Sequence, residues 1–244
     1  MIYNYAVKLY VIHIQYYLTN FIKMLFKERI KHLLNKYSQK SYAQEGEDLV
    51  LAYHLHNKKT GFYIDVGAHH PMHLSNSYYF YQQGWRGINI EPMPGSLKLF
   101  NQYRPRDINL ELPIAKEAKF LTYHIFNETA YNSFDKELAQ SRCAINKCKM
   151  IKTIEMKTFT LAEILKSHLP PKQMIDFLTI DAEGLDLEVL ESNDWEVYRP
   201  TMVLVEILNN QLENIKDNGL YQFLTNKNYK LFAKTINTYF FETL

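Results

Sequence analysis

The chain has 244 residues, of which 47% are hydrophobic and 22% are charged. These proportions are ordinary for a globular protein of one large domain or two small ones, and they exclude a disordered or fibrous chain. The two cysteines, Cys143 and Cys148, are too few for a disulfide framework or a four-cysteine zinc site, and they suit a reducing compartment.

The formal net charge of +2 is unevenly distributed along the chain. Residues 1–40 hold seven basic residues and one acidic residue, whereas residues 41–244 hold 21 basic and 25 acidic residues. The larger part of the chain is therefore slightly acidic. We expect no nucleic-acid partner, because a protein that follows a phosphate backbone presents a broad basic face.

The chain begins with a segment that lacks proline and glycine, at residues 2–36. Its early part is apolar nearly all round and its later part is amphipathic and basic, which predicts a helical arm over residues 1–40. The longest uncharged stretch, residues 9–22, is shorter than the roughly 20 apolar residues that span a bilayer. We expect the arm to pack on the domain or on a second copy in a homodimer, or to lie on an anionic membrane surface.

From residue 41 onward, short apolar runs alternate with helical patterns, which is typical of a parallel sheet with crossover helices. The predicted strands are 61–67, 87–91, 108–114, 120–126, 151–157, 175–181, 202–207, 229–235 and 238–243. The predicted helices are 49–55, 75–83, 94–103, 134–142, 160–168, 183–191 and 218–226. The last two strands form a predicted hairpin, so we expect one α/β domain over residues 41–244 whose sheet ends antiparallel.

The residues that directly follow the predicted strands lie at the edge of an open α/β sheet where ligands bind. They are Asp65, Gly67, Ala68, His69 and His70 after the first strand, Glu91 after the second, and Asp181, Glu183 and Glu206 after later ones. Most of these positions are acidic. The sequence therefore predicts an acidic ligand site at this edge.

The turn after the first strand has the sequence Asp-Val-Gly-Ala at residues 65–68. It lets backbone N–H groups approach a ligand, but it lacks the glycine series that binds a pyrophosphate, which counts against NAD. Glu91 follows about 25 residues later, where a carboxylate accepts hydrogen bonds from a ribose diol. This pattern fits an adenosyl ligand without a pyrophosphate, such as S-adenosylmethionine. The alternative is that Asp65 and Glu91 only cap turns.

A series of motifs runs in order from about residue 42 to residue 207. The motifs are YAQEGED (42–48), GFYIDVGAHHP (61–71), SNS with FY (75–81), GWRGINIEP (84–92), YNSF (131–134), DFLTIDAEG (176–184) and RP (199–200). The series resembles the FkbM family of S-adenosylmethionine-dependent methyltransferases. Departures are mild: Ser77 and Ser133 stand where that family often has threonine, and Glu91 where aspartate is common.

The resemblance implies a Rossmann-like class I methyltransferase fold, with a mostly parallel seven-stranded sheet and helices on both faces. It also implies an O-methyltransferase that acts on a hydroxyl of a sugar or glycan-type acceptor, in bacterial surface-polysaccharide biosynthesis. We expect the protein in the cytoplasm, at the inner face of the membrane if the arm binds lipid. The cofactor-binding residues implied are Asp65, Gly67, Ala68, His69, Asn76 and Glu91.

Asp181 and Glu183 are expected to face the site of methyl transfer. The acceptor hydroxyl must lose a proton, and we expect His70 or Asp181 to be the base. Asp181 and Glu183 could instead bind Mg²⁺ or Mn²⁺, since both metals prefer oxygen ligands. The alternative for Glu183 is that it only favours the dipole of the helix that follows.

Two other functions are consistent with a Rossmann-like chain. One is a nucleotide-dependent oxidoreductase or epimerase, against which the missing glycine series counts. The other is a binding module without catalytic activity, which would not need acidic groups at four strand ends.

Overall fold

The structure is a computed structural model that describes residues 2–33, 38–56, 58–144, 147–208 and 212–244. Within the first helix, it describes the side chains of residue 13 and of residues 15–33. The chain divides into two compact units, residues 1–40 and residues 41–244. The first unit contains the helix α1 (Ile2–Leu33), and residues 34–36 of the predicted arm helix lie outside the described residues. None of the described helices combines the length and the apolar character that crossing a bilayer requires.

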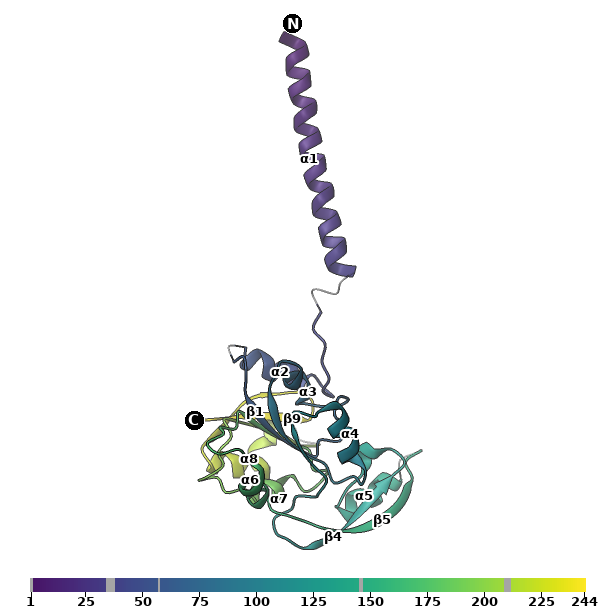
Figure 1. Ribbon diagram of the computed structural model, residues 1–244, viewed down its shortest axis with the longest axis vertical. Helices are drawn as coiled ribbons and strands as arrows, with labels where there is room; N and C mark the ends of the chain where they lie inside the picture. Colours follow the sequence, from purple (N-terminus) through teal and green to yellow (C-terminus); the bar gives the residue numbers. More distant parts are fainter. Residues whose placement is uncertain (1, 34–37, 57, 145–146, 209–211) are drawn as a thin grey trace. The chain divides into compact units, whose positions relative to one another are not determined.

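The second unit is built on a seven-stranded sheet (Figure 1). Its strands are β1 (Phe62–Val66), β2 (Arg86–Ile90), β3 (Ile108–Leu110), β6 (Phe177–Ile180), β7 (Met202–Glu206), β8 (Tyr229–Lys234) and β9 (Thr238–Thr243). Their order is β3-β2-β1-β6-β7-β9-β8, with the first five parallel and β9 antiparallel to both of its neighbours. The predicted Rossmann-like fold with a mostly parallel seven-stranded sheet is confirmed.

Helices cover both faces of this sheet, and a separate apolar core lies between the sheet and the helices on each face. The helices are α2 (Glu47–His54), α3 (Tyr78–Gln82), α4 (Ser96–Tyr103), α5 (Lys136–Cys143), α6 (Leu161–His168), α7 (Asp186–Glu191) and α8 (Gly219–Asn226). Side chains of α6, α7 and α8 form the larger core with one face, and side chains of α2 and α3 form the smaller core with the other. The predicted layered arrangement is therefore correct.

Strand β1 shows how the sequence assigns side chains to these two cores. Successive residues of a strand point to opposite faces. Phe62, Ile64 and Val66 accordingly lie in the larger core, whereas Tyr63 lies in the smaller one beside α2 and α3. Asp65 is two residues after Tyr63 and therefore points to the same face, so its carboxylate lies on the α3 side of the sheet. This placement decides what Asp65 can contact.

Residues between β3 and α6 form an insertion with a sheet of its own. β4 (Phe120–Phe126) and β5 (Met150–Lys157) pair antiparallel, and between them lie a short 3₁₀ helix (Thr129–Tyr131) and α5. The predicted strands 120–126 and 151–157 and the helix at 134–142 are thus present, but these strands are not part of the main sheet. Residues 145–146 of the predicted loop lie outside the described residues.

Three predicted elements are longer than the observed ones, for local reasons. The helix predicted from residue 183 begins at residue 186, because Glu183 and Gly184 have φ angles of 50° and 105°. The helix predicted from residue 75 begins at residue 78, and Ser75 Oγ accepts a hydrogen bond from the N–H of Tyr78. β3 ends at Leu110, before Pro113, which has no N–H for a ladder.

Candidate active site

A cavity of about 650 Å³ lies at the carboxyl ends of β1, β2, β6 and β7. Binding pockets for small molecules typically measure about 300–1,000 Å³. The strand order reverses direction between β1 and β6, so the cavity lies at the topological switch point. The insertion contributes Tyr123, Glu128–Phe134 and Arg142 to the lining, opposite the strand ends.

Most of the predicted site residues come together at this cavity. Gly67, His69, Asn76, Glu91, Asp181, Glu183 and Glu206 all line it. Asp65, Ala68 and His70 are not among the described lining residues. The geometry therefore separates the predicted set into two groups, and the roles assigned to the lining group remain predictions.

Gly67 is required where β1 turns toward the cavity. Its φ is 78°, and a Cβ added there would lie 1.8 Å from the carbonyl oxygen of Asp181. The two segments are held together because the N–H of Asp181 donates a hydrogen bond to the carbonyl of Val66, at 3.0 Å. Only glycine permits this close approach. Gly67 therefore allows the end of β1 to pack against the end of β6, and it is one of the residues that line the cavity.

Glu91 lies at the end of β2 with both carboxylate oxygens anchored. Oε2 accepts a hydrogen bond from the N–H of His69 and Oε1 accepts one from the N–H of Met93, each at 2.8 Å. Burial raises the pKa of Glu91 to about 7, although these two hydrogen bonds oppose the rise. Each oxygen retains a lone pair, so the carboxylate can accept further bonds from a diol in the cavity.

Asp65 belongs to a buried polar network beneath the cavity. Its carboxylate accepts a hydrogen bond from Ser77 Oγ, and Arg104 donates to the same Oγ at 3.1 Å. Arg104 has no exposed surface and forms an ion pair with Asp107 at 2.8 Å. Burial raises the pKa of Asp65 to about 6, with the hydroxyl of Ser77 opposing the rise. This network places Asp65 against Ser77 on the α3 side of the sheet, and its predicted role in cofactor binding stays a prediction.

His70 holds the turn that follows β1. Its Nδ1 accepts hydrogen bonds from the N–H groups of Met72 and His73, at 3.1 and 3.0 Å. Burial lowers the pKa of His70, and the nearby ring of His73 lowers it further. The ring is thus committed to the backbone. Among the described histidines, His69 and His73 line the cavity instead.

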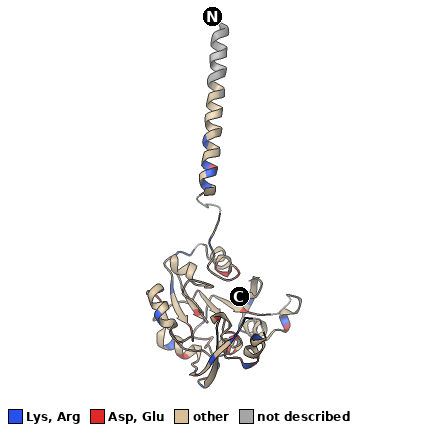
Figure 2. Ribbon diagram, turned by 90° about the vertical axis from the view of Figure 1, so that its right-hand side faces the viewer, with Lys and Arg blue, Asp and Glu red and all other residues tan. Residues whose placement is uncertain are grey.

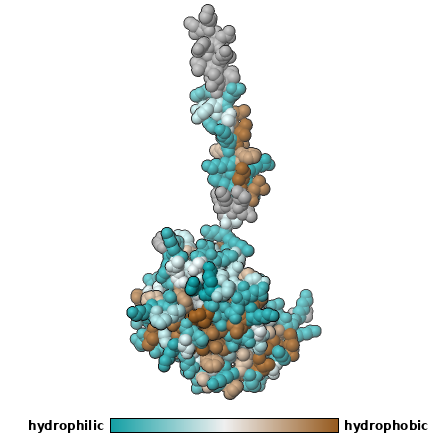
Figure 3. Space-filling view, viewed as in Figure 1, coloured by the Kyte–Doolittle hydropathy of each residue, from teal (hydrophilic) through white to brown (hydrophobic). Residues whose placement is uncertain are grey.

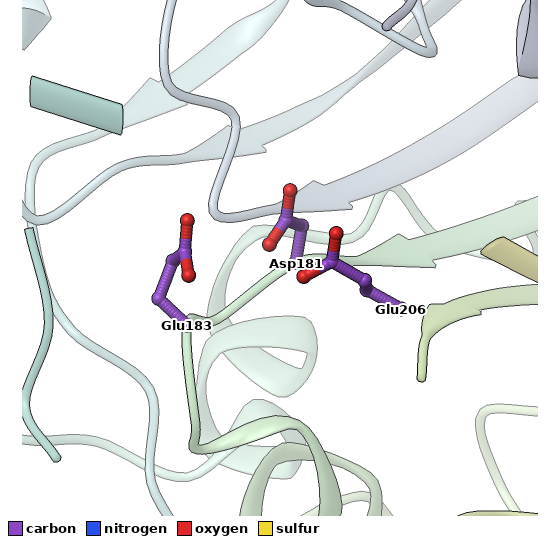
Figure 4. Close-up of side chains that lie close together, drawn as sticks. All are labelled: Asp181, Glu183 and Glu206. Atoms are coloured by element: carbon purple, nitrogen blue, oxygen red, sulfur yellow. The ribbon is translucent and has the colours of Figure 1, made fainter. Parts of the chain in front are cut away.

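Three carboxylates gather at the ends of β6 and β7. One ligand atom from each of Asp181, Glu183 and Glu206 lies within 4.8 Å of the other two (Figure 4). The buried Oδ1 of Asp181 has no hydrogen-bond partner among the described residues. Burial and the charge of Glu183 raise the pKa of Asp181, and burial raises the pKa of Glu206 to about 7.

This all-oxygen donor set is of the kind that Mg²⁺ and Mn²⁺ prefer. The unpartnered oxygen of Asp181 is available for either a cation or a proton. Glu206 is the member that the metal prediction omitted, although its position after a core strand marked it as a site residue. The cluster thus fits a cation, and it equally fits a shared proton.

Glu183 is tied to the insertion by two contacts. The buried Arg142 on α5 donates a hydrogen bond to its Oε2, and Ser133 Oγ donates to its carbonyl oxygen at 2.6 Å. Burial raises the pKa of Glu183, and the hydrogen bond from Arg142 opposes that rise. Glu183 also has a positive φ, which is uncommon outside glycine and recurs at functional sites.

The motif at residues 42–48 and the start of β9 contribute to the cavity lining near Glu206, which pairs with Thr238. Glu45 accepts hydrogen bonds from the N–H and Nδ2 of Asn237, each at 2.8 Å. Glu47, which is buried, accepts one from Thr238 Oγ1 at 3.1 Å. Sequence reasoning did not select Arg142, Glu47 or Asn237, because each reaches the cavity only through contacts distant in the chain.

The match to known proteins comes from a family model. A model described as the methyltransferase FkbM domain matches residues 65–231, which include the carboxyl end of β1, the insertion and the acidic cluster. No curated protein matches the chain. The matched segment covers more than half of the chain and carries every strand end that lines the cavity. The protein therefore belongs to the FkbM methyltransferase family.

Proposed function

We propose that the protein transfers a methyl group from S-adenosylmethionine to a hydroxyl oxygen of a sugar or glycan-type acceptor. The observation that carries this proposal is the charge of the cavity. Among the described residues, its lining holds the carboxyl groups of Glu47, Glu91, Glu128, Asp181, Glu183 and Glu206, and one guanidinium, that of Arg142. A dinucleotide pyrophosphate is disfavoured beside so many carboxylates, whereas a cationic ligand is favoured.

The residues at the ends of β1 and β2 fit an adenosyl ligand. When bound, S-adenosylmethionine supplies a methyl group already activated by a positively charged sulfur. Glu91 would hold the ribose hydroxyls with its remaining lone pairs, and the backbone at Gly67 would lie against the ligand. Asp181 and Glu183 would stabilise the positive charge nearby.

A polyhydroxylated acceptor suits the part of the cavity lined by residues 42–48 and the start of β9. Gln44 and Asn237 offer amide groups there, and Glu47 and Thr238 offer oxygens. Such side chains bind hydroxyl groups through several directional hydrogen bonds. The family resemblance and this polar lining together support a glycan acceptor, and a role in surface-polysaccharide biosynthesis in bacteria is the corresponding proposal.

The acidic cluster would accept the proton that the acceptor loses. The acceptor oxygen forms a bond to the methyl carbon as the carbon–sulfur bond breaks, and the hydroxyl proton passes to a carboxylate. Asp181 is favoured as that carboxylate, because its Oδ1 is unpartnered and its raised pKa increases its basicity. We propose this role for Asp181 in place of His70, whose Nδ1 is committed to the backbone.

A divalent cation held by Asp181, Glu183 and Glu206 is the second candidate for activating the hydroxyl. Its supporting observation is the convergence of three carboxylates within 4.8 Å. Such a cation would lower the pKa of the acceptor hydroxyl and would leave proton removal to His69 or to solvent.

The test is a transfer assay with methyl-labelled S-adenosylmethionine and a panel of nucleotide sugars and oligosaccharides. We expect label in an ether of one acceptor class, with stoichiometric S-adenosylhomocysteine. Asp181→Asn should lower kcat by about 10²–10⁴-fold, because it removes the proposed base. Label on nitrogen or carbon, or undiminished kcat in Asp181→Asn, would contradict the proposal.

A further inference from the structure

Helix α1 presents two parallel rows of side chains with contrasting chemistry. Residues four apart in a helix lie on one ridge. Lys23, Lys27 and Lys31 form a basic ridge, and Ile22, Phe26 and Ile30 form the apolar ridge directly beside it. These six residues line a shallow groove along the helix. One wall of the groove is therefore cationic and the other is apolar.

The apolar ridge is part of a wider apolar surface. Large apolar side chains exposed on the helix are Tyr16, Tyr17, Leu18, Phe21, Ile22, Met24, Leu25, Phe26, Ile30 and Leu33. A single helix cannot bury its own side chains, and α1 is the one regular element among the described residues of this unit. Contiguous apolar surface of this extent marks a binding face.

The charges on α1 and its flanks indicate what covers that face. Residues 1–40 carry a formal net charge of +6, with Glu28 as the single acidic residue. Figure 2 shows the described basic residues gathered on the half of α1 nearer its C-terminus, and Figure 3 shows apolar side chains along one side of it. Two such helices packed together would bring like charges close, which is unfavourable.

We propose that α1 lies in the interface of an anionic lipid bilayer. The apolar ridge would enter the boundary between headgroups and acyl chains, as amphipathic interfacial helices do. Lys23 and Lys27 would extend their aliphatic stems over that boundary and reach anionic headgroups, and Lys31, whose Nζ pairs with Glu28 at 2.8 Å, would add to the basic ridge. The tyrosines at 16 and 17 suit the same depth, since their rings are apolar and their hydroxyls are polar. This proposal is independent of the reaction catalysed.

The experiment is co-sedimentation of the full-length protein with vesicles of phosphatidylcholine alone and of phosphatidylcholine with 30% phosphatidylglycerol. We expect binding to the anionic vesicles and at least tenfold weaker binding to the neutral ones. Binding should weaken when salt rises from about 0.1 M to 1 M, because the Debye length falls from about 10 Å to 3 Å. Equal binding to both vesicles, or none to either, would overturn the proposal.

Matched variants distinguish the contribution of the basic ridge to vesicle binding from the contribution of the protein's overall charge. K23Q/K27Q/K31Q should weaken partition by on the order of a hundredfold, since each basic side chain near such a surface contributes about fivefold. K59Q/K98Q/K152Q removes three exposed lysines of the other unit and should change partition less than threefold. I22A/F26A/I30A should also abolish binding while α1 stays helical by circular dichroism, because alanine favours helix.

The alternative to a lipid surface is that α1 binds α1 of a second copy of the chain. Sedimentation velocity without lipid detects it directly. A dimer of the wild type that I22A/F26A/I30A converts to monomer, while vesicle binding is unchanged, would overturn the proposal in favour of a second copy. A wild-type protein whose association state is unaffected by those substitutions supports it.

Discussion

Arg142 on α5 donates a hydrogen bond to Glu183 Oε2, so the insertion is joined to the carboxyl end of β6 by an ion pair. The two side chains are 8% and 24% exposed, so the pair is largely shielded from water. The charge of Arg142 also opposes the rise in the pKa of two neighbouring carboxyl groups, those of Glu183 and Glu206. The position of the insertion over the cavity and the charge state of the acidic cluster therefore depend on the same contact.

Arg142→Ala should destabilise the protein by about 1–3 kcal/mol, because it leaves the Glu183 carboxylate beside Asp181 and Glu206 without its cation. This loss is smaller than that expected for a fully buried ion pair, since Glu183 is partly exposed to solvent. Urea unfolding measures this free energy. Arg86→Ala removes an exposed arginine and should stay within about 0.5 kcal/mol of the wild type. Equal effects of the two substitutions would mean that the ion pair contributes nothing.

Glu91→Gln should weaken binding of S-adenosylhomocysteine by about 10–100-fold. The amide loses the charge that strengthens bonds from a ribose diol, and its NH₂ group would oppose the N–H of His69 or Met93. Isothermal titration gives the affinity. Glu111→Gln is the control, because Glu111 also accepts two backbone N–H bonds but is not among the described cavity residues. A comparable loss in Glu111→Gln would refute the assignment.

The free energy of unfolding should fall as pH rises from about 4.5 to about 7. Burial raises the pKa of Glu91 from 4.5 to about 7, so the folded state retains a proton that the unfolded chain has released. The stabilisation is complete below pH 4.5 and is lost as pH approaches 7. Glu91→Gln should reduce the difference between pH 5 and pH 7.5 by about 2–3 kcal/mol. Identical slopes for variant and wild type in urea unfolding would contradict the raised pKa.

If the acidic cluster holds a divalent cation, titration of Mg²⁺ or Mn²⁺ into the protein should show one site. Glu206→Gln should weaken that binding at least tenfold, since the variant replaces a charged oxygen ligand. Glu196→Gln, an exposed carboxylate elsewhere, should leave it unchanged. The absence of binding at millimolar metal would assign the cluster to proton transfer alone.

The positions of the main-sheet strands along the chain were predictable because each core strand is a short apolar run that ends in a polar residue. The same local signal appears at 120–126 and 151–157, and nothing in it reveals that these strands pair with each other outside the main sheet. Partner choice is a property of distant contacts. The insertion was therefore read as strands and loop without its separate sheet.

The residues of the candidate site also differ in whether the sequence alone reveals them. Glu91, Asp181 and Glu183 were found because they directly follow strands, where backbone geometry alone brings them to the sheet edge. The contact observed for Asp65 is with Ser77 on the α3 side of the sheet, and its assignment to the ligand stays a prediction. Arg142 lies in a polar stretch with no motif, so only the folded insertion reveals its contact with Glu183.

The most direct test of the central claim is isothermal titration of S-adenosylhomocysteine into the full-length protein, with and without Mg²⁺. We predict one binding site per chain, with an affinity that Glu91→Gln lowers and Glu111→Gln does not. No heat of binding from a sample that is folded by circular dichroism would contradict the account, and would favour a binding module without methyltransferase activity.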